Sequence, residues 1–188
     1  MREEILKAAA QRFAKYGFYK TTIEEIASDL NKVKSALYYY FKTKEDLFKA
    51  VIETAQKKLW ASIETNVSAN KTQKEKLTTL ITSHLQAFGK ITEGYTSLLD
   101  LYFLEHTVVQ EVRKIYDDKE TAFLAELIRA GNKSGEFDVK DVKNVSVVIM
   151  TAIKGAEQEY VEKKHIKNIK IISEIMADML VKSIAKEK

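Results

Sequence analysis

The chain has 188 residues and carries 31 Lys and Arg against 27 Asp and Glu, a formal net charge of +4. Hydrophobic residues make up 45% and charged residues 31%, which is too apolar for a disordered chain and too polar for a membrane protein. There is no cysteine, and the three histidines lie far apart without a His-x-x-x-His pair. We therefore expect a globular protein without disulfides, metal or cofactor.

Proline is absent and only 6 residues are glycine, so almost nothing interrupts helical periodicity. This predicts an all-α protein of about nine helices. No apolar run approaches the roughly 20 residues of a membrane-spanning helix, and the first residues lack the apolar core of a signal peptide. We therefore expect a cytoplasmic protein with no membrane partner.

Two amphipathic helices are predicted at the start of the chain. Apolar residues at three- and four-residue spacing predict a helix over residues 2–16, and Gly17 is expected to end it in the left-handed conformation. Thr22 and Glu25 have the spacing of a capping box, in which each side chain bonds the backbone of the other residue. They predict a second short helix that ends at Leu30.

A third short helix is predicted from about residue 34 to residue 41, after a turn at Asn31. Val33 precedes it and has no side chain that can cap a helix. Its predicted core residues are Leu37, Tyr38 and Phe41. Thr43 then opens a long helix through a second Thr-x-x-acid signal.

Further helices are predicted over the remaining chain. The predicted breaks between them are the stretches 67–72, 89–94 and 131–135. Asp138 is the predicted N-cap of the penultimate helix. The last two helices, over about 139–163 and 166–186, are apolar over a wide arc, which predicts a homodimer interface. The alternative is that one subunit buries both helices by itself.

A basic and aromatic segment covers residues 31–44. It contains four lysines and no acidic residue, and three consecutive tyrosines follow one another at 38–40. Lysines neutralise phosphates and tyrosine hydroxyls donate to phosphate oxygens. The segment lies on the second helix of a tight pair, the arrangement of a helix-turn-helix DNA-binding motif. Periodicity alone equally allows a three-helix bundle whose lysines only keep it in solution.

Specific residues favour the helix-turn-helix interpretation. They are Phe13, Gly17, Thr21, Thr22, Ile23, Ile26 and Ala27, then Leu37 to Phe41, and then Lys44, Glu45, Asp46 and Leu47. In type, order and spacing, residues 1–50 resemble the DNA-binding domain of the tetracycline-repressor (TetR) family of bacterial regulators. The chain departs from the usual family pattern at Asn31, where a glycine is common. Beyond these residues the likeness is limited to a helical domain of suitable length.

The resemblance implies roles for individual residues. It implies phosphate contacts by Thr22 and the amides after it, base-edge contacts by Lys34, Ser35 and Ala36, and backbone contacts by Tyr39, Tyr40 and Lys44. Lys32, in the same basic segment, completes the predicted DNA-binding set. The implied domains are a helix-turn-helix DNA-binding domain over residues 1–47 and a helical ligand-binding and dimerisation domain over residues 48–188.

The predicted ligand site consists of aromatic and other apolar side chains with a few polar tips, as small-molecule sites usually do. Its residues are Trp60, Phe88, Tyr95, Tyr102, Phe103, His106, Phe123 and Met150. The alternative for each of them is ordinary core packing, which is the more common role of such residues. Glu105 and Glu157 are candidate partners for a cation, with solvated glutamates as the alternative.

Together these observations predict a transcriptional repressor that binds a palindromic operator as a homodimer and is released by a small, largely hydrophobic ligand. The alternative is a helical interaction protein whose helix-turn-helix segment no longer reads DNA. An enzyme is disfavoured, because the sequence shows no Ser/His/Asp cluster, phosphate-binding loop or metal-ligand motif.

Overall fold

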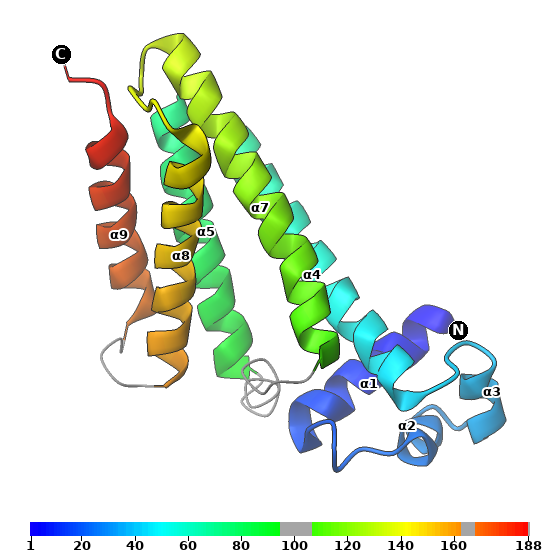
Figure 1. Ribbon diagram of the computed structural model, residues 1–188. Coiled ribbons are helices and arrows are strands. Elements are labelled where there is room, and N and C mark those ends of the chain that lie inside the picture. The colour runs from blue at the N-terminus through cyan, green and yellow to red at the C-terminus, as the bar shows by residue number, and fades with distance from the viewer. Residues whose placement is uncertain (95–106, 163–167, 188) are drawn as a thin grey trace. The chain divides into compact units, whose positions relative to one another are not determined.

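The structure, a computed structural model, describes residues 1–94, 107–162 and 168–187. Those residues form eight α-helices and no strand, apart from one isolated bridge between Phe137 and Ala185 (Figure 1). The helices are α1 (Arg2–Tyr16), α2 (Ile23–Asp29), α3 (Lys34–Tyr38), α4 (Lys44–Ser68), α5 (Gln73–Gly94), α7 (Thr107–Ser134), α8 (Val142–Val161) and α9 (Ile169–Ile184). The predicted all-α class is confirmed. Among the described helices, none is long and apolar enough to span a membrane.

The chain divides into two compact units. The first consists of Met1–Lys58 and Ile91–Lys114, and the second of Leu59–Lys90 and Ile115–Lys188. The helix α4 therefore begins in the first unit and ends in the second. The predicted domain boundary after residue 47 would fall within this continuous helix.

Local signals begin and end the helices of the first unit as predicted. Gly17 follows α1 with φ 80°, and Asn31 follows α2 with φ 53°, both in the left-handed region. The Thr22 hydroxyl accepts from the Glu25 amide at 3.3 Å, and the Glu25 carboxylate accepts from the Thr22 amide at 2.9 Å. The capping box at the start of α2 is confirmed.

The core of the first unit is built from apolar side chains of α1 to α4. Its fully buried residues include Ile5, Phe13, Ile26, Leu37, Leu47 and Phe48. The Phe13 ring lies 5.1 Å from the Phe48 ring in an edge-to-face contact. Leu37 and Phe41 are buried as predicted, but the prediction for Tyr38 was wrong, because 43% of its surface is exposed. Successive helical residues are about 100° apart, so Leu37 faces the core and its neighbour turns outward.

The third helix is shorter than predicted. It ends at Tyr38 rather than near residue 41, and the amides of Tyr40 and Phe41 both donate to the Leu37 carbonyl. Tyr39 and Tyr40 consequently lie in the turn that follows α3. As expected, Val33 precedes α3 without a side-chain cap.

The second unit packs the end of α4, α5 and α7 to α9 around one apolar core. The first two amides of α5, those of Gln73 and Lys74, donate to the two carboxylate oxygens of Glu136 at 3.0 and 3.1 Å. The segment that follows α7 thereby caps a helix more than sixty positions earlier in the chain. The loop predicted over residues 67–72 is present, although α4 extends through Ser68.

Two predicted breaks are helical instead. Gly89 lies inside α5, and Gly131 lies in the last turn of α7. A Cβ atom at Gly89 would lie 2.5 Å from Cγ2 of Ile169, and one at Gly131 would overlap the ring of Phe137. These glycines permit close packing between segments, and α7 ends only at Ser134, before Gly135 at φ 77°.

The penultimate helix begins three residues later than predicted. Its N-cap is Asp141, whose carboxylate accepts from the Asn144 amide at 3.1 Å, and not Asp138. The Asp138 amide instead donates to the Ile184 carbonyl at 3.1 Å, and so it joins the residues before α8 to the end of α9. An acidic residue at either position fits an N-cap, so the sequence pattern did not distinguish them.

Candidate nucleic-acid interface and buried polar network

The segment around α3 presents polar and aromatic groups to solvent. Tyr39 is 83% exposed and Tyr40 is 39% exposed, and their rings meet edge to face at 5.0 Å. Lys32, Lys34 and Ser35 are also exposed, while Ala36 is half-buried. Leu37, on the inner side, anchors the helix in the core. The structure therefore brings the predicted contact residues of this segment together on the surface of the first unit.

Lys34 is held by an acidic residue of the preceding helix. Its ammonium lies 3.3 Å from the Glu24 carboxylate, and both side chains are exposed. The pKa of Glu24 is lowered by its backbone hydrogen bond and then by the Lys34 hydrogen bond. An exposed pair of this kind contributes little to stability, so Lys34 can exchange Glu24 for another partner at low cost.

Thr22 is exposed at the start of α2. Its oxygen accepts from the Glu25 amide, which leaves the hydroxyl proton available for an external acceptor. Glu25 has a lowered pKa, chiefly because its carboxylate accepts from the Thr22 amide. The capping box thus orients a hydroxyl donor at the edge of the exposed surface.

Arg12 joins α1 to α2. Its guanidinium donates to Asp29 Oδ1 at 2.9 Å and lies 3.4 Å from a Glu25 oxygen. The hydrogen bond from Arg12 is the main cause that lowers the pKa of Asp29. Arg12 therefore contacts both ends of α2, a role that the sequence analysis did not identify because the partners are separated along the chain.

Lys44 differs in environment from the other predicted DNA-binding lysines. Its ammonium donates to the Phe18 carbonyl at 3.0 Å and to the Thr21 carbonyl at 3.1 Å, and it lies 4.3 Å from the centre of the Phe18 ring. The side chain is half-buried. The sequence did not predict these contacts, because the two carbonyls belong to residues more than twenty positions away.

The predicted ligand-site residues are only partly brought together. Trp60 and Phe123 meet edge to face at 5.4 Å. Phe88 and Met150 are each 4% exposed, and neither lines the groove described below. The predicted residues Tyr95, Tyr102, Phe103 and His106, and also Glu105, lie outside the described residues.

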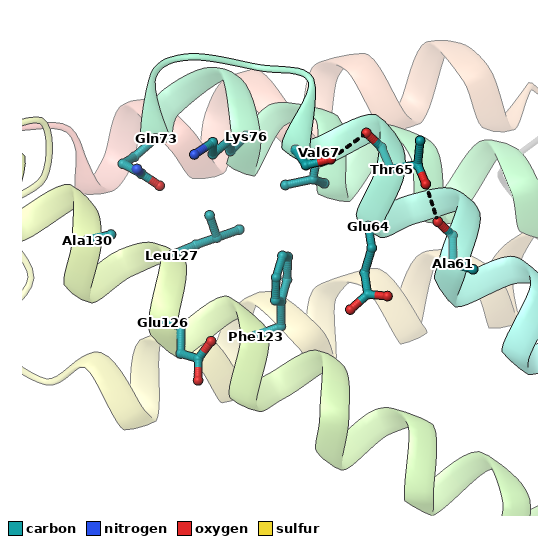
Figure 2. Close-up of a pocket in the computed structure, with 11 residues that line it drawn as sticks. Ala61, Glu64, Thr65, Val67, Gln73, Lys76, Phe123, Glu126, Leu127 and Ala130 are labelled. Carbon is teal, nitrogen blue, oxygen red and sulfur yellow. Dashed lines mark hydrogen bonds between the residues drawn. The ribbon is translucent and has the colours of Figure 1, made fainter.

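A groove of about 670 Å³ lies within the second unit between α4, α5 and α7. Phe123 and Leu127 project from α7 toward α4 and α5, and Glu64 and Glu126 also line the groove (Figure 2). Gln73 also lines the groove, and its buried side-chain oxygen has no hydrogen-bond partner. Of the predicted ligand residues, Phe123 is the one that lines this groove.

A histidine between two glutamates lies inside the second unit. The two ring nitrogens of His84, Nδ1 and Nε2, lie 2.7 Å from Glu120 Oε1 and 2.7 Å from Glu157 Oε1. These residues come from α5, α7 and α8, and all three are buried. Burial opposes the charged form of His84, but the two carboxylates outweigh it and raise the pKa well above its usual value. The raised pKa favours the doubly protonated ring, in which each nitrogen can donate to one of the two glutamates.

Sequence reasoning missed this network. In the sequence, His84 was one residue on an apolar helix face. The alternative that Glu157 is a solvated glutamate was wrong, because only 3% of Glu157 is exposed. The position of His84 between Ile81 and Leu85 on an apolar helix face could have indicated such a network, because a buried imidazole requires hydrogen-bond partners. Within the described ranges, no cluster of His, Asp and Glu side chains could hold a metal ion.

Two protein-family models match consecutive parts of this chain. The family model for bacterial regulatory proteins of the tetR family matches residues 5–51, and that for the C-terminal region of QacR-like proteins matches residues 57–186. The transcriptional regulator QacR of Staphylococcus aureus is 29% identical over 163 residues, which cover 82% of this chain and 83% of QacR.

Solved structures share the fold. A transcriptional regulator from Cytophaga hutchinsonii superposes with a TM-score of 0.81 at 26% identity, and the match covers 97% of each chain. A TetR regulator from Haloarcula marismortui superposes with a TM-score of 0.82 at 20% identity and 98% coverage of each chain. The chain therefore belongs to the TetR family of helix-turn-helix transcriptional regulators, with a C-terminal region of the QacR-like type.

Proposed function

We propose that this protein is a repressor that binds a palindromic operator as a homodimer and is released by a small, largely hydrophobic ligand. The observation that carries the DNA-binding part is the exposed surface around α3, where lysines and two tyrosines surround a helix anchored by one buried leucine. A short anchored helix of this kind suits the major groove, and the groups around it suit phosphate.

The proposed contacts divide between phosphate and base edges. Lys34, Ser35 and Ala36 face base edges from the start of α3, where a small side chain at 36 permits close approach. The phosphate contacts are proposed for Thr22, Lys32, Tyr39 and Tyr40, which carry hydroxyl or ammonium donors. A DNA-backbone contact is also proposed for Lys44, whose ammonium additionally donates to the Phe18 and Thr21 carbonyls.

The homodimer is proposed to form through α8 and α9. These helices pack together, and each also exposes apolar side chains. The exposed residues are Val147 (47%), Val148 (61%), Ile171 (52%), Ile175 (51%) and Met179 (65%). An apolar surface on two adjacent helices suits a four-helix interface with a second copy. Such a dimer presents two recognition helices to half-sites about 34–36 Å apart or a multiple of this spacing.

The ligand is proposed to bind in the helical domain over residues 48–188. The adjacent rings of Trp60 and Phe123 support an aromatic site, and the groove lined by Phe123 has the size of a small-molecule pocket. The ligand releases DNA only if its affinity differs between DNA-binding and released conformations. Residues 1–47 are the proposed DNA-binding domain.

The first test is fluorescence anisotropy with duplexes from the region upstream of the protein's own gene and with shuffled duplexes, each at two salt concentrations. We expect tighter binding to the native region and a strong dependence on salt. The variant Tyr39→Phe should weaken binding to all sequences on the order of tenfold, because one hydroxyl donor to phosphate is lost. Tyr116→Phe, on α7, is the matched control and should bind as the wild type does.

Lys34→Ala should additionally relax the preference at one base position. If the protein binds no duplex in a salt-dependent manner, the proposal is contradicted and the helical interaction protein is favoured.

The dimer is tested by sedimentation of two variants. Val148→Glu should be monomeric, whereas Ala122→Glu, on the exposed side of α7, should remain dimeric.

A further inference from the structure

Arg2 is the first residue of α1, and its guanidinium lies over the ring of Phe41, 5.2 Å from the ring centre. Phe41 belongs to the turn that joins α3 to α4, so this contact places the start of α1 beside that turn (Figure 1). A cation over an aromatic face at this distance is attracted to the ring. Phe41 is only 5% exposed, whereas Arg2 is exposed to solvent. The buried ring therefore holds a positive charge at the surface.

The Arg2 guanidinium contrasts in its hydrogen bonding with two lysines of this surface. Lys34 is paired with an acidic residue of α2, and the Lys44 ammonium donates to two backbone carbonyls. Within the described parts of the chain, Arg2 has neither a hydrogen-bond nor an ion-pair partner. Glu4, in the same turn of α1, lies 3.7 Å from the Met1 ammonium instead. The five N–H donors of the guanidinium are thus available to an external acceptor.

Phe41 directly follows two residues of the proposed DNA interface. Tyr39 and Tyr40 are proposed phosphate contacts, and Lys42, on the other side of Phe41, is exposed. Each strand of a duplex carries one phosphate for about every 3.4 Å of its axis. A strand that reaches Tyr40 therefore has further phosphates close to Phe41, within reach of a long side chain held over that ring.

We propose that Arg2 is a further contact to the DNA backbone, made from the start of α1. The DNA interface thereby extends beyond the helix-turn-helix motif and the turn after α3. A guanidinium can hold a phosphate through two parallel N–H donors, and such a contact responds to charge and not to base sequence. This inference rests on the proposed DNA-binding function.

The alternative is that Arg2 only covers the Phe41 ring with its side chain. Covering the ring requires an apolar stem, whereas binding phosphate requires the positive charge, so three variants separate the two roles. Arg2→Met keeps an unbranched apolar side chain and loses the charge, and Arg2→Lys keeps the charge. Lys7→Met is the matched control, because it removes one charge from an exposed position of the same helix, about 140° around its axis from Arg2.

The first measurement is fluorescence anisotropy at several salt concentrations, with the duplex that the wild-type protein binds most tightly. Each phosphate contact adds about 0.9 to the slope of log K against log salt. We expect Arg2→Met to lower this slope by about 0.9 and to weaken binding roughly fivefold to tenfold at about 0.1 M salt, with a smaller loss at higher salt. Arg2→Lys and Lys7→Met should keep the wild-type slope. Circular dichroism establishes that each variant is folded.

The second measurement locates the contact on the DNA. Duplexes are prepared in which one phosphate at a time is replaced by a neutral methylphosphonate. At one position the replacement should weaken binding of the wild type and leave binding of Arg2→Met unchanged, which is the coupling expected of two groups in direct contact.

An unchanged salt slope in folded Arg2→Met would overturn the inference and leave Arg2 as a cover for the Phe41 ring. An equal fall of the slope in Lys7→Met would also overturn it, because the effect would then belong to the overall charge of α1. If Arg2→Met does not fold, Arg2→Gln decides by the same criteria. Failure of the wild-type protein to bind any duplex would overturn the proposed function instead, and it is recognised without any variant.

Discussion

The two units of the molecule contrast in how their helices end. In the first unit α1 and α2 end at Gly17 and near Asn31, residues in the left-handed conformation, and α2 begins at its capping box. In the second unit α5 and α7 continue through Gly89 and Gly131, because contacts with Ile169 and Phe137 require a residue without a side chain. In the first unit a glycine thus ends a helix, whereas in the long packed helices of the second unit a glycine allows a neighbouring segment to pack closely.

The interiors of the units differ as well. The core of the first unit is aromatic and aliphatic, with Phe13, Phe18 and Phe48 in mutual contact. The second unit buries an imidazolium and two carboxylates among apolar side chains. The second unit should therefore be the more sensitive to loss of a single polar partner and to pH.

The largest effect is expected when the charged centre of the second unit is removed. His84→Leu leaves Glu120 and Glu157 buried without their common partner, and it should lower the free energy of unfolding by about 3–5 kcal/mol. Urea denaturation measures this loss. The matched change in the same helix, Leu85→Met, keeps side-chain volume and should cost less than about 1.5 kcal/mol. Equal losses in the two variants would show that the network has no special importance.

The same network predicts a pH dependence. Because the folded-state pKa of His84 is raised above its unfolded value of about 6.5, its stabilisation is fully present below that pH. It is lost as pH rises through the folded pKa, by up to about 1.4 kcal/mol for each pH unit between the two pKa values. Urea denaturation at pH 6 and pH 9 should therefore show lower stability at the higher pH.

His84→Gln is the control for this pH dependence, since it cannot titrate in that range. An equal slope in the wild type and in His84→Gln would assign the pH dependence to other groups.

The glycine contrast is tested by alanine substitutions. Gly131→Ala should lower the free energy of unfolding by about 1–3 kcal/mol, because the new methyl group overlaps the buried Phe137 ring. Gly155→Ala, in α8 with no atom within 4 Å of the new Cβ, should raise it by about 0.5–1 kcal/mol through helix propensity. Stabilisation by both variants would contradict the close-packing role of Gly131. A loss at Gly155 would indicate that a second copy approaches this face of α8.

A small effect is expected at the local signal that begins α2. Thr22→Ala removes the side-chain half of the capping box and should lower the free energy of unfolding by about 1 kcal/mol. Thr22→Ser keeps the hydroxyl and should lose much less. Thermal denaturation of the three proteins measures the difference. Similar losses for Ala and Ser would mean that the threonine methyl group, and not the cap, stabilises this turn.

Much of the surface around α3 was predictable from sequence. The lysines and Tyr39 and Tyr40 were identified from residue type and spacing, and they lie exposed beside a buried Leu37. The outward position of Tyr38 was not predicted, because a tyrosine suits both a core and a surface.

The sequence by itself determined the all-α class, the first two helices and their caps, and the family, because these depend on residues within a few positions of each other. Only the tertiary structure decided that Lys44 contacts the turn before α2 and that His84 joins Glu120 and Glu157. The partners of Lys44 are 26 and 23 positions away, and those of His84 are 36 and 73 positions away. A local sequence pattern cannot predict contacts between residues so far apart in the chain, because only the packing of the helices brings these groups within hydrogen-bonding range.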